Sequence, residues 1–502
     1  MNLDYSNLQN GSDIRGVAIA KEGEAANLGR EETLRLTAAF AMWLSKEGQK
    51  PLEELTISVG YDSRVTAREL KQAVCDSLSF LGVKTYDCGL ASTPAMFMAT
   101  MFEEFECDGA IMITASHLPY NRNGFKYFNK EGGLNKGDIT EIIKSAEAIE
   151  EVKGEAKGSY TKADLMSVYS QYLKDKIIEE VKHKEFPQKP LTGLKIVVDA
   201  GNGAGGFYAT DVLAPLGANI EGSQFLEPDG TFPNHPPNPE NKEAMESICK
   251  AVIENKANFG LIFDTDVDRS SAVDGSGKEI NRNSIVAMAA ALIAKENPGT
   301  TVVTDSITSD YLTEYLEKCL GLKHLRFKRG YKNVINKSIE LNNQGIDSQL
   351  AIETSGHAAY KENYFLDDGA YLATKIVIKA AQLKQDGQPL EVVLQSLKEP
   401  VESTEYRFAI NRTDFSEYGD YVLDNLNQWA SGEGGKKVGA SVVTPNYEGV
   451  RINFNNDRVK GWCLLRKSLH DPQMPLNIEA EKGSCQDILE ILSELFEPFD
   501  IS

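Results

Sequence analysis

Three aspartates stand at alternate positions directly after an apolar run. The stretch "GLIFDTDVDRSS" (260–271) places Asp264, Asp266 and Asp268 at the end of a predicted buried strand, and Arg269 follows them. Carboxylates this close repel one another unless a cation lies among them. Oxygen ligands suit Mg²⁺ or Ca²⁺. An EF-hand is excluded, because it needs Gly and Glu where this loop has Arg269 and Gly275. The remaining alternative is a solvated acidic loop.

A serine and a histidine stand side by side at the end of another predicted strand. In "ITASHLPYNRNGFKYF" (113–128) the apolar run 110–113 leads to Ser116 and His117, and Arg122 and Lys126 follow. A serine hydroxyl is a poor nucleophile unless a partner activates it.

Two later stretches carry groups that can bind a polar ligand. In "AIETSGHAAYKENYFLDDGAY" (351–371), Glu353, Ser355 and His357 can point at one hydroxylated ligand, or form a surface turn before a helix that begins near Asp368. In "GWCLLRKSLHDPQMP" (461–475) several hydrogen-bond donors gather in one turn. That turn is either a phosphate cradle or an exposed basic turn. Its donors are Arg466, Lys467, Ser468 and His470.

A glycine-rich stretch allows two interpretations. Gly201, Gly203 and Gly206 in "GNGAGG" fit the G-x-G-x-x-G pattern of dinucleotide-binding proteins. Close packing between a strand and a helix explains the same glycines. The pattern alone does not decide between them.

The elements that must position these residues follow one plan. The runs 55–64, 193–203 and 300–309 are each β-branched, end in a polar loop and precede a helical pattern. Such units build sheets with helices on their faces, and ligands lie at the carboxyl ends of the strands. A helical stripe is expected at Leu165, Tyr169, Tyr172 and Leu173, and another at Leu372, Ile376, Ala380 and Leu383. A last helix is predicted to begin at Ser484, whose spacing to Asp487 is typical of a capping box.

Length and composition limit the class of protein. The 502 residues suffice for several domains, and the net charge of −21 argues against nucleic acid or an anionic membrane as a partner. Seven widely spaced cysteines form neither a disulfide framework nor a zinc motif, which favours the cytoplasm. The N-terminal stretch has no apolar segment of the kind found in signal peptides. No apolar run approaches the ~18 residues of a membrane span.

Taken in order, the motifs resemble the α-D-phosphohexomutase superfamily, which includes phosphoglucomutases, phosphomannomutases and phosphoglucosamine mutases. The resemblance rests on "TASHLP" with "NGFK", "DTDVDR", "ETSGH" and the C-terminal Arg-x-Ser loop, and "SDIRG" and "GYDSR" also fit it. It implies three similar α/β domains with mixed or parallel sheets and a smaller α+β C-terminal domain. The implied boundaries are 1–155 (phosphoserine loop), 156–298 (metal loop), 299–398 (sugar loop) and 399–502 (phosphate-binding loop).

The resemblance also implies a role for each motif. Ser116 would carry the transferable phosphoryl group and, with Asp264, Asp266 and Asp268, would hold Mg²⁺. Phosphoryl would pass to a hexose 1-phosphate and return from a 1,6-bisphosphate, which serves as intermediate and activator. Arg15, His117, Arg269 and Lys126 would add positive charge, and His357 and Lys126 are the candidate general acid and base. The sugar phosphate would contact Glu353, Ser355, Gly330, Tyr331, Lys332, Arg269, Arg466, Ser468 and His470.

Several positions depart from the family's pattern, and alternatives remain open. Leu118 replaces the usual Asn, Leu469 and His470 change the phosphate loop, and Pro475 replaces a downstream Arg. Glucose and mannose phosphates are the favoured substrates, with amino sugars as an alternative. A catalytically impaired sugar-phosphate-binding homologue is a second alternative. A phosphatase that uses Asp264 as its nucleophile, as the haloacid dehalogenases use the first Asp of a D-x-D motif, is a third.

Overall fold

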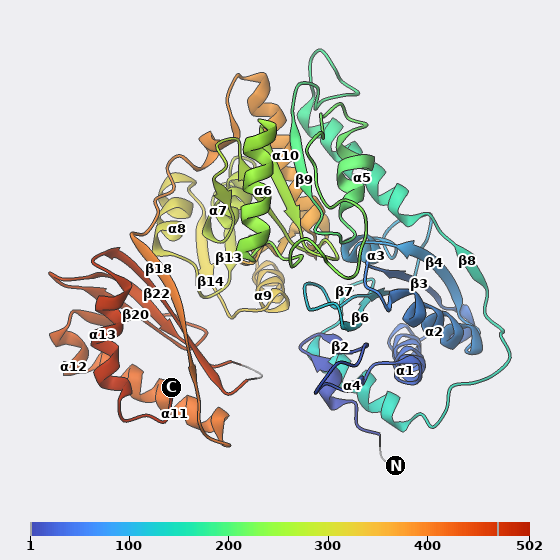
Figure 1. Ribbon diagram of the computed structural model, residues 1–502, viewed down its shortest axis with the longest axis horizontal. Coiled ribbons are helices and arrows are strands. Elements are labelled where there is room, and N and C mark those ends of the chain that lie inside the picture. Colours follow the sequence, from blue (N-terminus) through green and yellow to red (C-terminus); the bar gives the residue numbers. More distant parts are fainter. Residues whose placement is uncertain (1–2, 469–470) are drawn as a thin grey trace. The chain divides into compact units, whose positions relative to one another are not determined.

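The computed structural model describes residues 3–468 and 471–502 (Figure 1). The chain divides into two compact units. The first unit contains residues 1–295 and 349–395, and the second contains residues 296–348 and 396–502. The predicted departures at Leu469 and His470 lie outside the described residues.

The first unit contains an eight-stranded mixed sheet. Its strands are β1 (Gln9–Asn10), β2 (Asp13–Val17), β3 (Thr56–Tyr61), β4 (Lys84–Leu90), β5 (Gly109–Ile113), β6 (Arg122–Asn129), β7 (Gly132–Gly133) and β8 (Tyr160–Lys162). They are ordered β1-β2-β6-β5-β3-β4-β8, and β7 pairs with β6. Strands β5, β3, β4 and β8 run parallel to one another, whereas β6 is antiparallel to both β5 and β2. The predicted strands at 55–64 and 110–113 are therefore neighbours in one sheet.

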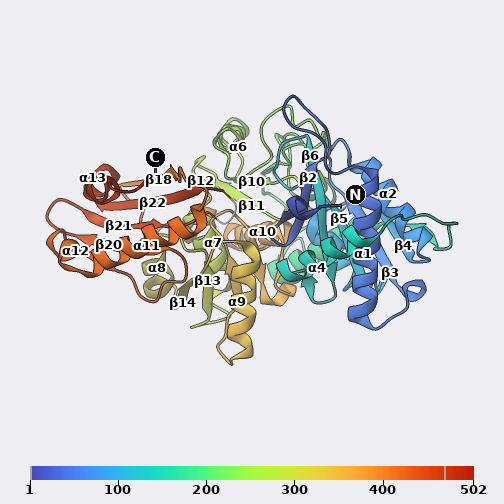
Figure 2. The ribbon, with the colours of Figure 1, turned by 90° about the horizontal axis from the view of Figure 1, so that it is seen from below.

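Helices cover this first sheet. They are α1 (Arg30–Gly48), α2 (Ala67–Phe80), α3 (Thr93–Met98) and α4 (Lys136–Ala148). Helix α1 packs against α2 and α4, as Figure 2 shows for α4. Its buried residues Leu36, Ala39, Phe40, Trp43 and Leu44 recur at helical spacing, so they form one apolar stripe toward the sheet. The ring of Phe40 stacks on Tyr127 of β6, with ring centroids 4.3 Å apart.

A second, four-stranded sheet of the first unit carries the aspartate loop. It contains β9 (Ile196–Asp199), β10 (Phe259–Phe263), β11 (Ser270–Asp274) and β12 (Glu279–Ile280) in the order β12-β11-β10-β9. Strand β10 is parallel to β9 and antiparallel to β11. The helices of this region are α5 (Leu165–Val181), α6 (Lys242–Asn255) and α7 (Asn283–Ala294), and a π-helical turn spans Tyr208–Leu213.

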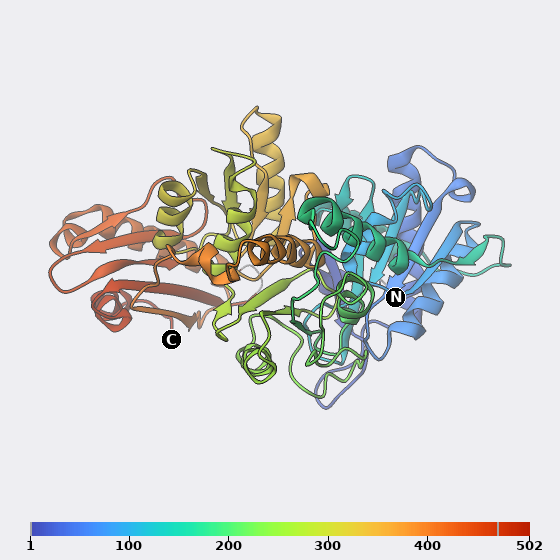
Figure 3. The ribbon, with the colours of Figure 1, turned by 90° about the horizontal axis from the view of Figure 1, so that it is seen from above.

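The last part of the first unit holds β15 (Leu350–Ile352), β16 (Ala358–Tyr360), β17 (Leu366–Asp367) and α10 (Gly369–Gln385). The three strands pair antiparallel in that order. Helix α10 packs against α5 (Figure 3). Its predicted stripe is confirmed, because Leu372, Ile376, Ala380 and Leu383 are all buried. Asp368 caps the helix by accepting a hydrogen bond from the Tyr371 amide at 2.8 Å.

The predicted stripe of α5 is largely confirmed as well. Leu165, Tyr169 and Leu173 are fully buried, and Tyr172 is half-buried. The Tyr169 hydroxyl donates to Asp368 at 2.7 Å, so the two helices are joined by a buried polar contact as well as by apolar packing.

In the second unit, the segment 296–348 contains β13 (Thr301–Thr304) parallel to β14 (Lys323–Arg326), with α8 (Asp310–Glu314), a π-helical turn (Tyr315–Cys319) and α9 (Tyr331–Asn343). The C-terminal segment forms an antiparallel sheet in the order β18-β22-β21-β20-β19. Its elements are β18 (Glu402–Ala409), α11 (Phe415–Ser431), α12 (Glu433–Lys437), β19 (Ala440–Val442), β20 (Val450–Asn455), β21 (Lys460–Leu465), β22 (Gln473–Lys482) and α13 (Cys485–Phe496).

Helix α13 begins where the sequence predicts. The Ser484 hydroxyl accepts from the Asp487 amide at 3.2 Å, and Asp487 accepts from the Ser484 amide at 2.9 Å, which completes a capping box. Ile488 and Leu492 are fully buried, while Ile491 and Leu495 are partly buried against the same core. Helix α11 contributes Val422 and Leu426 to that core.

The α/β class with mixed sheets and a different C-terminal part is confirmed. The four boundaries stay a prediction, and residues 299–398 contribute to both compact units. The seven cysteines are free thiols. Among the helices of residues 3–468 and 471–502, none is long and apolar enough to cross a membrane.

The glycine-rich stretch packs against the aspartate loop. A Cβ on Gly203 would lie 2.6 Å from the carbonyl oxygen of Thr265, and the next amide, Ala204 N, donates to that oxygen at 2.7 Å. Close backbone packing therefore accounts for this glycine. It places the 201–206 turn directly beneath the loop that carries the aspartates.

We expect Gly203→Ala to destabilise the chain by about 1–3 kcal/mol, because the added methyl group overlaps backbone that cannot move aside. Gly137→Ala in α4 is the matched control, since a Cβ there meets nothing within 4 Å. That control should raise stability by up to about 1 kcal/mol through helix propensity. Urea unfolding followed by circular dichroism measures both variants. Equal midpoints for the two would contradict the packing account.

Candidate active site

Ser116 lies on the loop between β5 and β6, and its side chain meets the aspartate loop. Its Oγ donates a hydrogen bond to Asp264 Oδ2 at 3.0 Å and contacts His117 Nδ1 at 3.2 Å. The Ser116 amide donates to Thr114 Oγ1 at 2.8 Å. The sequence places these residues 148 positions apart, and the first unit brings them into direct contact.

The three aspartates are fully buried at the end of β10. Their carboxylate oxygens lie within 4.8 Å of one another, as a metal site requires. Asp266 Oδ2 accepts from Thr93 Oγ1 at 2.5 Å, and Asp264 Oδ1 accepts from the Arg269 amide at 3.2 Å. A solvated acidic loop is thereby excluded.

Basic side chains from other elements surround these carboxylates. Lys126 of β6 donates to Asp268 and lies 3.8 Å from Asp266. Arg15 of β2 donates to Asp13 at 2.9 Å and to the Ala115 carbonyl at 3.0 Å. Arg269 Nε lies 4.0 Å from Asp264 Oδ2. The predicted cations Arg15, Lys126 and Arg269 therefore reach the same site.

The surrounding charges shift the pKa values of Asp264 and Asp268 in opposite directions. Burial, together with the charges of Asp268 and Asp266, raises the pKa of Asp264 well above its usual range. Burial acts in the same direction on Asp268, but the positive charges of Lys126 and Arg269 outweigh it and lower its pKa. The charged form of Asp264, which Ser116 contacts, is thus less well compensated than that of Asp268.

The site contains buried acceptors and buried donors that have no hydrogen-bond partner among the described residues. Oδ1 of Asp266 and Oδ1 of Asp268 accept no hydrogen bond from the described residues, and Nε of Arg15 and Nε of Arg269 donate none to them. Buried polar atoms without partners are rare in folded proteins. Oxygen atoms of this kind fit a hard divalent cation, and the guanidinium donors fit an anion such as a phosphoryl group.

Two histidines lie at this site. His117 is next to Ser116, and burial with the charges of Arg269 and Arg15 lowers its pKa to about 2. His357 lies beside Arg269 through a single antiparallel bridge, and its Nδ1 bonds to Asp367. Burial and the charge of Arg269 lower the pKa of His357 to about 4. Both rings are therefore neutral at pH 7.

The rest of the predicted Glu-x-Ser-x-His stretch lies in the same turn. The Glu353 amide donates to the His357 carbonyl at 2.9 Å, and the Gly356 amide donates to the Glu353 carbonyl at 3.1 Å. Glu353 and Ser355 are each 5% exposed. The turn between β15 and β16 therefore lies against the end of the aspartate loop, through the Arg269–His357 bridge and the bond from the Ser270 amide to the Gly356 carbonyl at 3.3 Å.

The remaining predicted residues belong to the second unit. Arg466 lies 3.6 Å from Glu405, and its amide donates to the Pro475 carbonyl at 3.1 Å. The Ser468 hydroxyl accepts from the Asp471 amide at 3.3 Å. Pro475 therefore contributes its carbonyl to the loop. His470 lies outside the described residues.

The predicted sugar loop Gly330, Tyr331 and Lys332 begins helix α9 in that unit. Gly330 has a φ of +107°, which favours glycine, and Tyr331 is the first residue of α9. The preceding residue, Arg329, donates its amide to Glu448 at 3.2 Å and lies 3.7 Å from Asp305. The charge of Arg329 also lowers the pKa of Arg466, after burial, which is the larger cause.

Three residues of the first-unit site were not predicted from the sequence. Asp367 bonds to His357, Thr93 bonds to Asp266, and Arg64 binds the backbone of the Ser116 loop. Arg64 stands in the quoted stretch "GYDSR", which is the only signal that could have found it. The contacts of Thr93 with Asp266 and of Asp367 with His357 form only in the folded chain, and their spacing in the sequence does not predict them.

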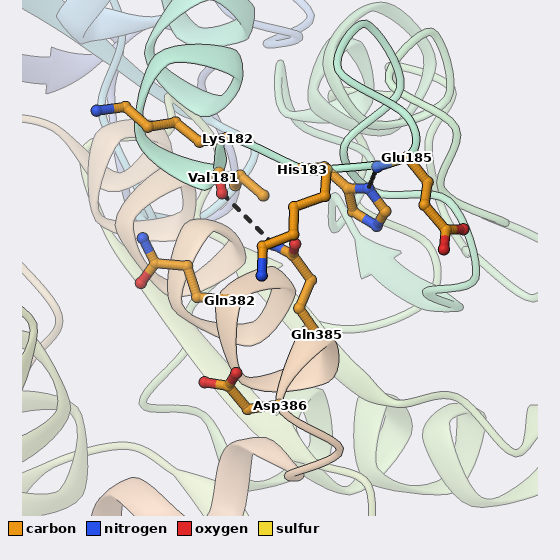
Figure 4. A pocket seen from close by; sticks show the side chains of 8 residues that line it. Val181, Lys182, His183, Glu185, Gln382, Gln385 and Asp386 are labelled. Atoms are coloured by element: carbon orange, nitrogen blue, oxygen red, sulfur yellow. Dashed lines mark hydrogen bonds between the residues drawn. The ribbon is translucent and has the colours of Figure 1, made fainter.

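A pocket elsewhere in the first unit contains none of the predicted residues. It has a volume of about 500 Å³ and lies between the C-terminal ends of α5 and α10 (Figure 4). Gln385 Nε2 donates to the Val181 carbonyl at 3.4 Å across it, and His183 Nδ1 accepts from the Glu185 amide at 3.2 Å. It offers no carboxylate cluster of the kind found beside Ser116.

Comparisons with known proteins agree with this geometry. Residues 6–153, 169–277 and 281–400 match the alpha/beta/alpha domains I, II and III of phosphoglucomutase/phosphomannomutase. The chain belongs to the phosphoglucomutase/phosphomannomutase family. It is therefore an enzyme of the phosphohexomutase type, with a phosphorylated sugar as the class of substrate, as the motifs predict.

Relatives match most of the chain. A phosphomannomutase/phosphoglucomutase of Pseudomonas syringae is 30% identical over 93% of this chain and 90% of its own. A phosphoglucomutase/phosphomannomutase of Thermococcus kodakarensis is 30% identical over 93% of this chain and 94% of its own. The crystal structure of a family protein from Burkholderia thailandensis has a TM-score of 0.79 at 26% identity and covers 99% of both chains.

The lowered pKa values of His117 and His357 predict how the stability of the protein depends on pH. An unfolded chain protonates histidine near pH 6.5, whereas folded His117 and His357 stay neutral down to about pH 2 and pH 4. The folded state binds fewer protons between about pH 4 and 6.5, so stability falls as the pH decreases through that window. The two groups should together lower the unfolding free energy by on the order of 4 kcal/mol from pH 7 to pH 5.

Metal-free, dephosphorylated protein is the sample for this measurement. Urea unfolding at pH 7 and pH 5 is compared between the wild type and the double variant His117→Gln/His357→Gln. The variant should show the smaller loss of stability at pH 5. The same loss in both proteins would show that these histidines titrate normally in the folded state.

Proposed function

We propose that this chain is a Mg²⁺-dependent phosphohexomutase that interconverts hexose 1-phosphates and hexose 6-phosphates through a phosphoserine at Ser116. The observation that carries the proposal is the 3.0 Å contact between Ser116 Oγ and Asp264, inside a buried cluster of three aspartates ringed by basic side chains. A buried hydroxyl placed between acceptors for a metal and donors for an anion suits reversible phosphorylation.

The transfer step exchanges one phosphorus–oxygen bond for another. The bond between phosphorus and Ser116 Oγ breaks, a bond forms between phosphorus and a hydroxyl of the sugar phosphate, and the hydroxyl proton leaves to a base. The product of this step is a hexose 1,6-bisphosphate. In the reverse transfer Ser116 takes the other phosphoryl group, and the isomerised monophosphate is released.

His357 is our candidate for the general base. Its ring is neutral at pH 7, so it can accept a proton, and Asp367 holds Nδ1. Lys126 is the candidate acid, since its ammonium group already donates to Asp268. His117 contacts Ser116 Oγ and would orient it.

Asp264, Asp266 and Asp268 would hold Mg²⁺ beside Ser116. When bound, the metal would offset negative charge on the phosphoryl group. Arg15 and Arg269 would donate to the phosphoryl oxygens through atoms that bond to no described residue in the present structure. These local positive charges matter because the chain as a whole is strongly acidic and repels anions.

Glucose and mannose phosphates are the substrates we propose. Glu353 and Ser355 would bind sugar hydroxyls. Arg466, Ser468 and His470 would bind the phosphate that is not reacting, and Gly330, Tyr331 and Lys332 would contact the substrate. Support comes from relatives named phosphomannomutase/phosphoglucomutase, and from a Neisseria gonorrhoeae phosphoglucomutase that is 29% identical over 85% of this chain. An amino-sugar phosphate is the alternative. A cytoplasmic location, and the absence of nucleic-acid and membrane partners, stay predictions.

Phosphorus NMR tests the reaction. Protein with Mg²⁺ and a trace of glucose 1,6-bisphosphate is given the 1-phosphates of glucose, mannose, glucosamine and N-acetylglucosamine in turn. We expect conversion of glucose and mannose 1-phosphates to 6-phosphates, and loss of conversion in Ser116→Ala, which lacks the nucleophile.

The other outcomes are informative. Release of inorganic phosphate without a 6-phosphate would favour a phosphatase with Asp264 as nucleophile. Fastest turnover of an amino sugar would assign the phosphoglucosamine branch. No turnover by protein that carries phosphate on Ser116 would favour a sugar-phosphate-binding homologue.

The metal site has its own test in thermal unfolding. Mg²⁺ at 100 times its dissociation constant should stabilise the wild type by about 2.7 kcal/mol, and Asp266→Asn should lose this effect. In EDTA the same variant should melt above the wild type, since it removes one of three repelling buried carboxylates. Asp424→Asn, at an exposed position of α11, is the control. Equal Mg²⁺ shifts in Asp266→Asn and the wild type would contradict the site.

A further inference from the structure

Arg64 binds the backbone of the Ser116 loop at four points. Its guanidinium group donates to the carbonyl oxygens of Ser116 and Leu118, the latter at 2.6 Å. It also donates to the carbonyls of Pro119 and Arg122, both at 2.9 Å. These four oxygens span the whole turn from the end of β5 to the start of β6. One side chain therefore closes the loop that carries the serine.

Ser116 itself has a backbone conformation that needs support. Its φ is +48°, in the left-handed region that a non-glycine residue rarely adopts. Such a residue persists only where its surroundings hold it there. The bond from Arg64 to the Ser116 carbonyl fixes the peptide plane that follows the serine, and the bond from Arg15 to the Ala115 carbonyl fixes the plane before it. The direction of Oγ follows from these two planes.

The Arg64 side chain is buried beneath the loop and is not available to a substrate. It is 2% exposed, and its Nε lies 3.5 Å from Asp62, whose carboxylate accepts from the Arg64 amide at 2.9 Å. The ring of Phe232 lies over the guanidinium carbon at 5.4 Å. Gly230 packs on the same turn, where a Cβ would lie 2.5 Å from Val65 N. The 229–232 segment thereby covers Arg64.

A guanidinium group is suited to this arrangement. Its donors project in one plane with fixed directions, so it can hold several carbonyls at set positions. Here Nη1 and Nη2 each donate to two carbonyls. An ammonium group has rotatable donors on a flexible stem and cannot impose the same geometry.

We propose that Arg64 is a positioning residue for phosphoryl transfer: it sets the Ser116 loop so that Oγ is held at Asp264 whether or not it carries a phosphoryl group. This inference rests on the proposed function. Arg64 touches neither the reacting atoms nor the metal ligands, and it acts through the Ser116 peptide.

The experiment compares Arg64→Lys and Arg64→Ala with the wild type in the full chain. A misplacement of about 1 Å at a reacting atom lowers turnover about 100-fold. We expect kcat to fall about 100-fold in Arg64→Lys, with KM within about threefold, because the sugar-binding residues are untouched. In Arg64→Ala, guanidinium chloride should restore part of the lost kcat, whereas tetramethylammonium chloride at the same concentration should not.

The rate of amide hydrogen exchange measures the stability of the Ser116 loop independently of turnover. The Ser116, Leu118 and Arg122 amides donate within the loop, so peptides covering residues 115–122 should exchange faster in Arg64→Ala while β5 stays protected. Arg68→Lys and Arg68→Ala are the matched controls, since Arg68 is an exposed arginine four residues further on. They should leave kcat, KM and exchange unchanged.

Several results would overturn the proposal. These are a folded Arg64→Lys protein with kcat within about threefold of the wild type, an increase of KM alone, or an equal loss of kcat in Arg68→Lys. Failure of both Arg64 variants to fold would assign Arg64 to folding instead of positioning. If the wild type converts no hexose phosphate, the proposed function fails, and exchange at 115–122 still decides whether Arg64 holds the loop.

Discussion

Three fully buried carboxylates set the main constraint on the first unit. Moving one such charge out of water costs several kcal/mol unless an opposite charge or a metal compensates it. The compensating charges come from distant parts of the chain: Lys126 lies on β6 and Arg15 on β2, and Arg269 follows the loop itself. The ends of these strands must therefore converge on the aspartate loop. The order of strands in the first sheet, in which β6 lies between β2 and β5 and is antiparallel to both, makes that convergence possible.

Backbone packing holds the aspartate loop from several sides. A Cβ on Gly203 would meet the carbonyl of Thr265, and one on Gly356 would lie 2.5 Å from the Ser270 carbonyl. On Gly369 it would lie 2.5 Å from the Arg269 carbonyl carbon. Three segments thus approach the loop with no side chain between. Such contacts leave little room for the loop to relax, which keeps repelling carboxylates at metal-binding distance. The glycine-rich stretch 201–206 serves this packing.

Local signals in the sequence predict much of this arrangement. The apolar run 260–263 predicts the strand that delivers Asp264, Asp266 and Asp268 to the turn after it. Ser484 and Asp368 begin helices because their side chains cap free amides. Contacts made only in three dimensions escape such rules. Asp367 reaches His357 through the pairing of two short strands, and Arg64 reaches the Ser116 loop across more than 50 residues. The division of residues 299–398 between two units also depends on tertiary packing, which the hydrophobic periodicity of the sequence does not predict.

The anchoring of Ser116 has a consequence for the proposed cycle. The peptides on both sides of the serine are bonded to buried arginines, and Oγ is bonded to Asp264. In the proposed cycle, a serine held through these two peptides would keep one position, and the sugar bisphosphate would turn beside it. The bond from Oγ to Asp264 would be lost on phosphorylation, because a phosphorylated Oγ has no proton to donate. The two arginines would then hold the loop in both states.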